Sequence, residues 1–213
     1  YSTKYIQKVN PLKNIKISNF NFKDETIAND NWTNLINGLV FNYVFNIELR
    51  NINGVNTTHN LVNVRKSQKI LLDNLNIKNP QVISVGGKGY GIQFVECHDI
   101  YAKNLKGENE RHVIDIADGS NAIIENVTSN TSEFGISLHG VYEHDITFKN
   151  ILGQLQVGQS GTEFGNASMN IFIENSTSRV IGAFCDNLIV RNSHIRLSNF
   201  MYNSTFENCD ISI

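Results

Sequence analysis

Residues 46–52 read Asn-Ile-Glu-Leu-Arg-Asn-Ile, residues 121–127 read Asn-Ala-Ile-Ile-Glu-Asn-Val, and residues 145–151 read Asp-Ile-Thr-Phe-Lys-Asn-Ile. Apolar and polar residues alternate in these stretches, which is the pattern of a half-buried β-strand. Each stretch also has an asparagine at its sixth position. The same pattern recurs along the chain, and its sixth-position residues, which we call the anchor asparagines, are Asn19, Asn51, Asn74, Asn104, Asn126, Asn150, Asn175, Asn192 and Asn208.

The spacing of the anchor asparagines predicts the fold. Successive anchors are 32, 23, 30, 22, 24, 25, 17 and 16 residues apart. A step of 22 to 25 residues suits one turn of a three-sided β-helix, longer steps leave room for loops, and the last two suggest a narrower end. No stretch has the apolar spacing of a long helix. We therefore predict an all-β protein, a right-handed single-stranded parallel β-helix of about eight to nine coils, in one domain covering residues 1–213.

The anchor asparagines have a structural interpretation. Each one follows a predicted strand, where the chain has to turn, and asparagine tolerates the left-handed backbone conformation that such turns use. Asparagines at the same corner of stacked coils can also hydrogen bond to one another. We therefore expect an asparagine ladder along one edge of the β-helix.

A second short strand precedes several of the anchors, in residues 38–41, 60–63, 91–94, 112–115 and 135–138. Aligning these segments on their apolar residues gives one inward-facing column. We expect that column to contain Leu39, Leu61, Ile92, Val113 and Ile136.

Charge and composition exclude several classes of function. The net charge of −2 and the pI of about 6.3 provide no basic surface for a nucleic acid or an anionic membrane. No apolar run approaches the roughly 20 residues that span a bilayer. The chain begins with Tyr1 and its last residues, 210–213, are strand-like, so we interpret it as a segment or mature fragment of a longer protein.

The metal-binding residue types do not form a recognisable site. Cys97, Cys185 and Cys209 match no zinc spacing and are odd in number, so we expect buried thiols instead of a disulfide framework. His98 and His144 each precede an aspartate at equivalent corners of the repeat, which favours corner hydrogen bonds over metal binding. We predict no metal ion and no cofactor.

One region brings together residues that could carry chemistry. In the alignment of the second strands, His112 is level with Gly91 and Gly135, and its outward neighbours are Gln93 on the preceding coil and Ser137 and His139 on the next. Glu110 and Glu133 lie two positions before the aligned residues. Three consecutive coils would thus direct one group of side chains towards one face: Glu110, Arg111, His112, Asp115, Glu133 and His139.

These residue types suit cleavage of a glycosidic or phosphodiester bond. One carboxyl group can protonate the leaving oxygen while another acts as base or nucleophile. We assign Glu133 or Asp115 as the general acid and Glu110 as the second carboxylate. Arg111, His112 and His139, with Gln93 and Ser137, would bind the polymer, since arginine can bind a carboxylate or phosphate with two hydrogen bonds. The alternative is a solvated, charged sheet face that binds nothing.

The runs at residues 111–119, Arg-His-Val-Ile-Asp-Ile-Ala-Asp-Gly, and at residues 134–140, Phe-Gly-Ile-Ser-Leu-His-Gly, resemble phage tail proteins of the pectin-lyase-like β-helix fold. Neck-appendage and tail-spike proteins of this family bind or degrade teichoic acids and capsules. The resemblance implies a homotrimer in the virion tail, outside the cell, that contacts other tail proteins and binds a sugar polymer near Arg111, His112 and His139.

Departures from related enzymes narrow the expected activity. The chain has no Asp-Asp pair and only a partial Gly-His-Gly in Leu138-His139-Gly140, which disfavours a polygalacturonase. A calcium-binding cluster of aspartates and the motif of alginate epimerases are also missing from the sequence. We therefore expect a phage adhesin or depolymerase segment that acts on a bacterial cell-wall or capsular glycopolymer. The rivals are a non-enzymatic β-helix shaft and a secreted bacterial polysaccharide-degrading enzyme.

Overall fold

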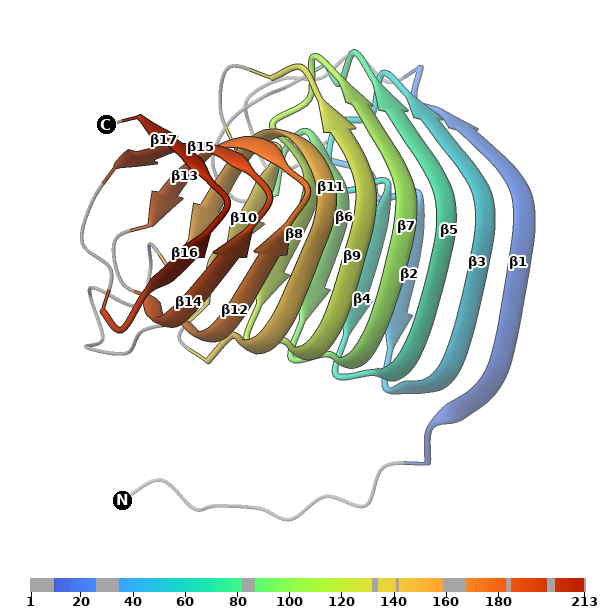
Figure 1. Ribbon diagram of the computed structural model, residues 1–213. Helices are drawn as coiled ribbons and strands as arrows, with labels where there is room; N and C mark the ends of the chain where they lie inside the picture. The colour runs from blue at the N-terminus through green and yellow to red at the C-terminus, as the bar shows by residue number, and fades with distance from the viewer. Residues whose placement is uncertain are drawn as a thin grey trace, which may run out of the picture.

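A computed structural model describes residues 10–25, 35–81, 87–131, 134–140, 142–158, 168–182, 185–198 and 202–212 (Figure 1). Within these ranges the protein is all-β, without a helix, and all strand pairings are parallel. The strands are β1 (Leu12–Lys23), β2 (Leu39–Asn42), β3 (Val44–Val55), β4 (Val62–Arg65), β5 (Gln68–Lys78), β6 (Tyr90–Val95), β7 (His98–Glu108), β8 (His112–Ala117), β9 (Ser120–Ser129), β10 (Ile136–Leu138), β11 (His144–Val157), β12 (Ser168–Glu174), β13 (Thr177–Gly182), β14 (Cys185–Arg191), β15 (His194–Ser198), β16 (Thr205–Glu207) and β17 (Asp210–Ser212).

The strands form two stacked series that belong to one strongly curled sheet. The first series runs β1, β3, β5, β7, β9, β11, β12, β14 and β16, and its members lie side by side in Figure 1. The second runs β2, β4, β6, β8 and β10 to the end of β11, and continues through β13, β15 and β17. Each strand pairs with the strand two positions later over most of the chain, so the chain returns to the same side after every repeat. This arrangement is compatible with a parallel β-helix.

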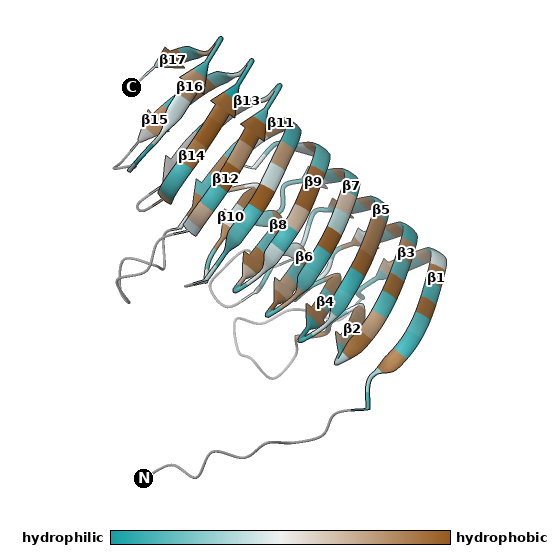
Figure 2. Cartoon of the chain, turned by 60° about the horizontal axis from the view of Figure 1, so that its bottom comes forward, coloured by the Kyte–Doolittle hydropathy of each residue, from teal (hydrophilic) through white to brown (hydrophobic). Residues whose placement is uncertain are grey.

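The core lies on the inner side of this sheet. Figure 2 shows hydrophobic and hydrophilic residues alternating along the strands of the first series. The inward positions form continuous buried columns, of which one contains Leu49, Leu72, Ala102, Ile124, Phe148, Ile173 and Val190. Burying each large aliphatic side chain contributes about 1.5–3 kcal/mol relative to leaving it exposed. The period-two pattern of the repeat therefore determines which side of the sheet faces the core.

The anchor asparagines have the conformation that the sequence predicts. All nine have a left-handed backbone, with φ between 48° and 63°. The ladder also forms: Asn51, Asn74 and Asn150 each donate through Nδ2 to Oδ1 of the anchor one coil earlier, at 2.9 Å. Asn104 departs from the pattern, because it donates to Oδ1 of Asp73 at 2.8 Å. The prediction of a structural role for these asparagines is confirmed.

The second series differs from the sequence alignment by one residue in two strands. Ile92 pairs with Val62 on one side and Ile114 on the other, and Ile114 pairs with Ile136. Leu61 and Val113 were expected in this inward column, but each lies one position before it. His112 was expected level with Gly91, but it is level with Tyr90, and on the outward face Asp115 is level with Gln93 and Ser137.

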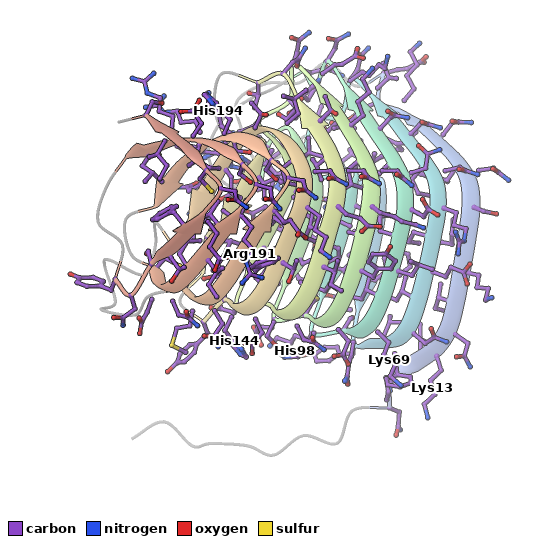
Figure 3. All side chains as sticks on the ribbon, in the orientation of Figure 1. Lys13, Lys69, His98, His144, Arg191 and His194 are labelled. Atoms are coloured by element: carbon purple, nitrogen blue, oxygen red, sulfur yellow. The ribbon has the colours of Figure 1, made fainter. Side chains whose placement is uncertain are left out.

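The remaining histidines and cysteines have structural partners. His98 Nδ1 lies 2.6 Å from Ser120 Oγ, and His144 Nδ1 lies 2.7 Å from Asp145 Oδ2, at the corner where strands of the first series begin (Figure 3). Corner hydrogen bonding is thus confirmed. All three cysteines are free thiols, and burial raises the pKa of Cys97 to about 11 and that of Cys185 to about 12. Cys209 departs from the expectation because it is only half-buried.

Replacing an anchor asparagine tests its two contributions separately. Asn126 has φ of 56° and hydrogen bonds to Asn104 at 3.1 Å and to Asn150 at 2.9 Å. We expect Asn126→Ala to lower the free energy of unfolding by about 2 kcal/mol, because alanine loses the ladder and disfavours positive φ. Asn126→Gly keeps the backbone freedom and should cost only about 1 kcal/mol. Urea unfolding measures both, and equal losses would show that the backbone conformation contributes nothing.

Candidate functional site

A column of polar side chains runs across the outward side of the second series. It consists of Asn63 on β4, Gln93 on β6, Asp115 on β8, Ser137 on β10 and Gln156 on β11, which the parallel register places level with one another. We call these five residues the polar column. Four of them are buried and Gln93 is half-buried, although they lie opposite the hydrophobic core. Buried polar groups at these positions need hydrogen-bond partners from within the column.

Amide side chains supply those partners in one direction along the column. Gln93 Oε1 accepts from Asn63 Nδ2 and from Asn60 Nδ2, both at 3.1 Å. Gln93 Nε2 in turn donates to Asp115 Oδ2 at 3.0 Å. Further along, Ser137 Oγ donates to Gln156 Oε1 at 3.0 Å. Because Gln93 is held by two donors at its oxygen, its amide nitrogen must face Asp115, and this fixes the orientation of the carboxyl group.

Asp115 and His139 form a carboxyl–imidazole pair at the centre of the column. Asp115 is fully buried, and burial raises the pKa of its carboxyl group, while the hydrogen bond from Gln93 and the charge of His139 partly oppose this rise. His139 Nδ1 lies 4.0 Å from Asp115 Oδ1, and the imidazole side chain is 50% exposed. Among the described residues Asp115 Oδ1 has no hydrogen-bond partner. The pair thus joins a buried carboxyl group to an imidazole that solvent and ligands can reach.

Glu110 lies in a different setting from Asp115. Its side chain is buried beneath the turn between β7 and β8, where Ser129 Oγ donates to Glu110 Oε1 at 2.5 Å. Gly107 makes space for it, since a Cβ at that position would collide with the carboxylate. Burial raises the pKa of Glu110, and the hydrogen bond from Ser129 opposes this. The hydrogen bond of Glu110 therefore connects it to β9, and its role as a second carboxylate stays a prediction.

His112 and Arg111 pack around Tyr90 at the start of β6. The imidazole of His112 contacts the Tyr90 ring with 4.5 Å between centroids and hydrogen bonds through Nδ1 to the carbonyl oxygen of Phe134. Burial lowers the pKa of His112 to about 4, so the ring is neutral at pH 7. The guanidinium carbon of Arg111 lies 5.4 Å from the Tyr90 ring centroid. Of these two expected binding residues, only Arg111 is partly exposed.

Sequence reasoning placed Glu133 in the site, but Glu133 lies outside the described residues. It also missed Asn60, Asn63 and Gln156, which complete the polar network. A signal for Asn63 and Gln156 exists in the sequence, because an apolar residue followed by a polar one recurs at 62–63, 92–93, 114–115, 136–137 and 155–156. Glu143 was missed as well. It is a buried carboxylate with a raised pKa due to burial, and it accepts hydrogen bonds from the backbone nitrogen of Gly140 and from Ser168 Oγ.

Comparisons with known proteins found no match for this chain among protein-family models, curated proteins or solved structures. Within the described ranges no group of three or more His, Cys, Asp or Glu residues is arranged to hold a metal ion. In the same part of the chain no helix is long and apolar enough to cross a membrane.

The neutral, buried His112 predicts a specific acid sensitivity. Its pKa of about 4 lies below the ordinary value of 6.5, so unfolding takes up a proton between these pH values. The stability that neutral His112 contributes is complete above pH 6.5 and is lost as pH falls towards 4. We expect this loss to reach about 3 kcal/mol in total. Asp115, Glu110 and Glu143 act in the opposite sense, since their raised pKa values make stability fall as pH rises through them.

A variant separates the histidine from the carboxyl groups. His112→Phe preserves a ring against Tyr90 and cannot titrate. Urea unfolding from pH 7 to pH 4 should therefore show a smaller loss of stability in His112→Phe than in the wild type. Parallel losses in the two proteins would contradict the assignment of a depressed pKa to His112.

Proposed function

We propose that this chain is the polymer-binding segment of a phage tail spike or appendage, and that it binds an anionic bacterial surface glycopolymer such as a teichoic acid. The observation that carries the proposal is the pair of Asp115 and His139, in which a half-exposed imidazole lies 4.0 Å from a buried carboxyl group that Gln93 orients. Arg111 lies one residue before β8, so a cationic side chain lies on the strand next to the one that precedes His139.

The chemistry of these groups favours an anionic polymer. An arginine can form two hydrogen bonds with a phosphate or carboxylate, and a histidine can donate one to the same kind of group. The register pairs Ile116 with Leu138, so His139 is level with Ala117, six residues beyond Arg111 along the strand direction. A polymer that contacts both residues would therefore lie obliquely across β8 and β10, and not along the line of level neighbours.

The proposed assembly follows from the fold and from the resemblance to phage tail proteins. We propose that the curled sheet closes into a right-handed parallel β-helix of eight to nine coils, within a longer chain of the virion tail, outside the bacterial cell. Contacts with other tail proteins belong to the same proposal. The homotrimer that the resemblance implies stays a prediction.

A more specific form of the proposal is that the chain also cleaves the polymer that it binds. A general acid has to reach the leaving oxygen at about 3 Å. Asp115 has a raised pKa, which suits an acid, but its full burial favours a role in positioning His139. In a catalytic mechanism His139 would therefore contact the polymer, and Asp115 would orient its imidazole. Glu110 is fully buried as well, so its role as the second carboxylate stays a prediction, as does the role of Glu133 as the general acid.

Retention on immobilised polymer tests the proposal. The wild-type protein should be retained on purified teichoic acids or capsules of its host, and His139→Ala should weaken retention at least about tenfold, because it removes the exposed donor. Asp115→Asn should give an intermediate loss. His194→Ala is the matched control, because His194 is also a half-exposed histidine beside an aspartate, 2.8 Å from Asp210, at a different corner.

Mass spectrometry of the same polymers, after incubation with the protein, distinguishes a depolymerase from an adhesin. Fragments that the wild type releases and His139→Ala does not would establish a depolymerase. Retention without fragments would establish an adhesin. If neither retention nor fragments were found with any host polymer, the proposal would be contradicted, and the non-enzymatic shaft would remain. Fragmentation of a plant or algal polysaccharide alone would instead support a secreted bacterial enzyme.

A further inference from the structure

A line of charged residues with strictly alternating sign crosses the outer face of the first series. The cations are Arg50 on β3, Lys103 on β7, Lys149 on β11 and Arg191 on β14. The anions Asp73 on β5, Glu125 on β9, Glu174 on β12 and Glu207 on β16 fall between and after them. The parallel register makes all eight level neighbours on consecutive strands. We call these eight residues the charge ladder.

The charge ladder is partly neutralised within the chain. Arg50 Nη1 lies 2.7 Å from Asp73 Oδ2, and Arg191 Nε lies 2.7 Å from Glu207 Oε2. Lys103 and Lys149 form looser pairs with Asp73 and Glu174, each at 3.7 Å. The four cationic side chains stay between 29% and 45% exposed. They can therefore still interact with charges outside the chain, and Figure 3 shows Arg191 on this face.

A second outward column runs beside the charge ladder, two residues earlier on each strand. It contains the apolar Leu71, Ile123, Phe172 and Ile189, the aromatic Tyr101, whose hydroxyl group donates to Glu125, and the polar Thr147, again on consecutive strands. We call these six residues the outer apolar column. Ile123 is exposed and the other five are half-buried. An apolar column on the outside of a sheet, bordered by charges, is typical of a protein interaction surface.

The charge ladder is complementary to itself when its direction is reversed. Reading it from Arg50 to Glu207 gives plus and minus in turn over eight positions, so the reversed order gives minus and plus. We propose that this face binds the same face of a second copy of the chain, in an antiparallel dimer. The two-fold axis would lie in the interface plane, perpendicular to the stack, and would cross it between Glu125 and Lys149.

This arrangement pairs both columns at once. Glu125 faces the second copy's Lys149, and Lys103 faces its Glu174. The outer pairs, Asp73 with Arg191 and Arg50 with Glu207, are opposite in sign too. The rotation preserves the lateral position on the face, so the outer apolar column meets itself: Tyr101 lies against Phe172, and Leu71 lies against Ile189. A parallel two-fold dimer about the ladder would instead place each charge against its own copy.

The size of the face predicts a weak dimer. Eight strands about 4.8 Å apart give a length of about 34 Å. With a width of about 15 Å for two outward columns, the dimer would bury about 1,000 Å² in total, at the lower end for specific complexes. We therefore expect dimerisation at micromolar concentrations and strong dependence on salt, because the charges pair at a partly exposed surface. The inference is independent of glycopolymer binding, which we place on the second series, and it is an alternative to the homotrimer that the resemblance implies.

Two single charge reversals and their mixture test the dimer by sedimentation velocity. In Glu125→Lys the new lysine faces Lys149 of the other copy, and in Lys149→Glu the new glutamate faces Glu125. Each variant alone should dimerise at least about tenfold more weakly than the wild type, because two repulsive contacts form per dimer. In an equal mixture, the lysines of one variant face the glutamates of the other. The mixture should therefore regain dimers, which no defect in folding could produce.

Lys66→Glu is the matched control for Lys149→Glu. Lys66 is 46% exposed and lies 3.7 Å from Glu96, whereas Lys149 is 40% exposed and lies 3.7 Å from Glu174. Lys66 lies outside both columns, so its reversal should leave dimerisation unchanged. Three outcomes would overturn the proposal. The wild-type protein could stay monomeric at all concentrations, or it could have a three-chain mass that the reversals leave unchanged. The mixture of the two variants could also be no more dimeric than each variant alone.

Cross-linking determines the direction of the pairing. In a Cys209→Ser background, Leu71→Cys and Ile189→Cys proteins are mixed and treated with a short bismaleimide. The antiparallel dimer places these two thiols opposite each other, so the mixture should give covalent dimers. Leu71→Cys alone should not cross-link, because five strand spacings, about 24 Å, would separate the two copies of residue 71. Efficient cross-linking of Leu71→Cys alone would indicate a parallel arrangement and overturn the proposal.

Discussion

The parallel backbone ladder, held in one register from repeat to repeat, is the constraint on which the rest of this structure depends. It can continue only if the chain turns at each corner without disturbing the neighbouring repeats, and left-handed asparagines provide that turn at all nine anchors. Their side chains then hydrogen bond along the corner. Because register is fixed, residues one repeat apart share an environment, and the protein is organised in columns of equivalent side chains.

The polar column shows how far this organisation extends. A buried carboxyl group would ordinarily be costly, but the coil on one side supplies Gln93, whose own oxygen is satisfied by Asn60 and Asn63. The network therefore tolerates Asp115 without making it an ordinary exposed acid. The half-exposed imidazole of His139 is where this interior network reaches the surface.

The first series could be predicted from the sequence because its strands alternate strictly between apolar and polar residues. The register of the second series could not be predicted in the same way. Leu61 and Val62 are both apolar, as are Val113 and Ile114, and all four are fully buried. A strand that is buried on both faces has no alternation to distinguish them, so the alignment was wrong by one residue there. The partnership of Glu110 with Ser129 was also hidden, since it joins a turn to the following strand and follows no repeat.

The alternating charges also bear on how a repetitive chain finds its own register. Near-identical repeats allow a strand to stack on the wrong predecessor during folding. If β5 were skipped, Arg50 would stack on Lys103, and if β7 were skipped, Asp73 would stack on Glu125, so that either error places like charges about 5 Å apart. Skipping two strands would again place opposite charges side by side, but it would leave two repeats of the chain to be looped out. The alternation of charge therefore disfavours the smallest misalignment of the chain, in which a single strand is skipped.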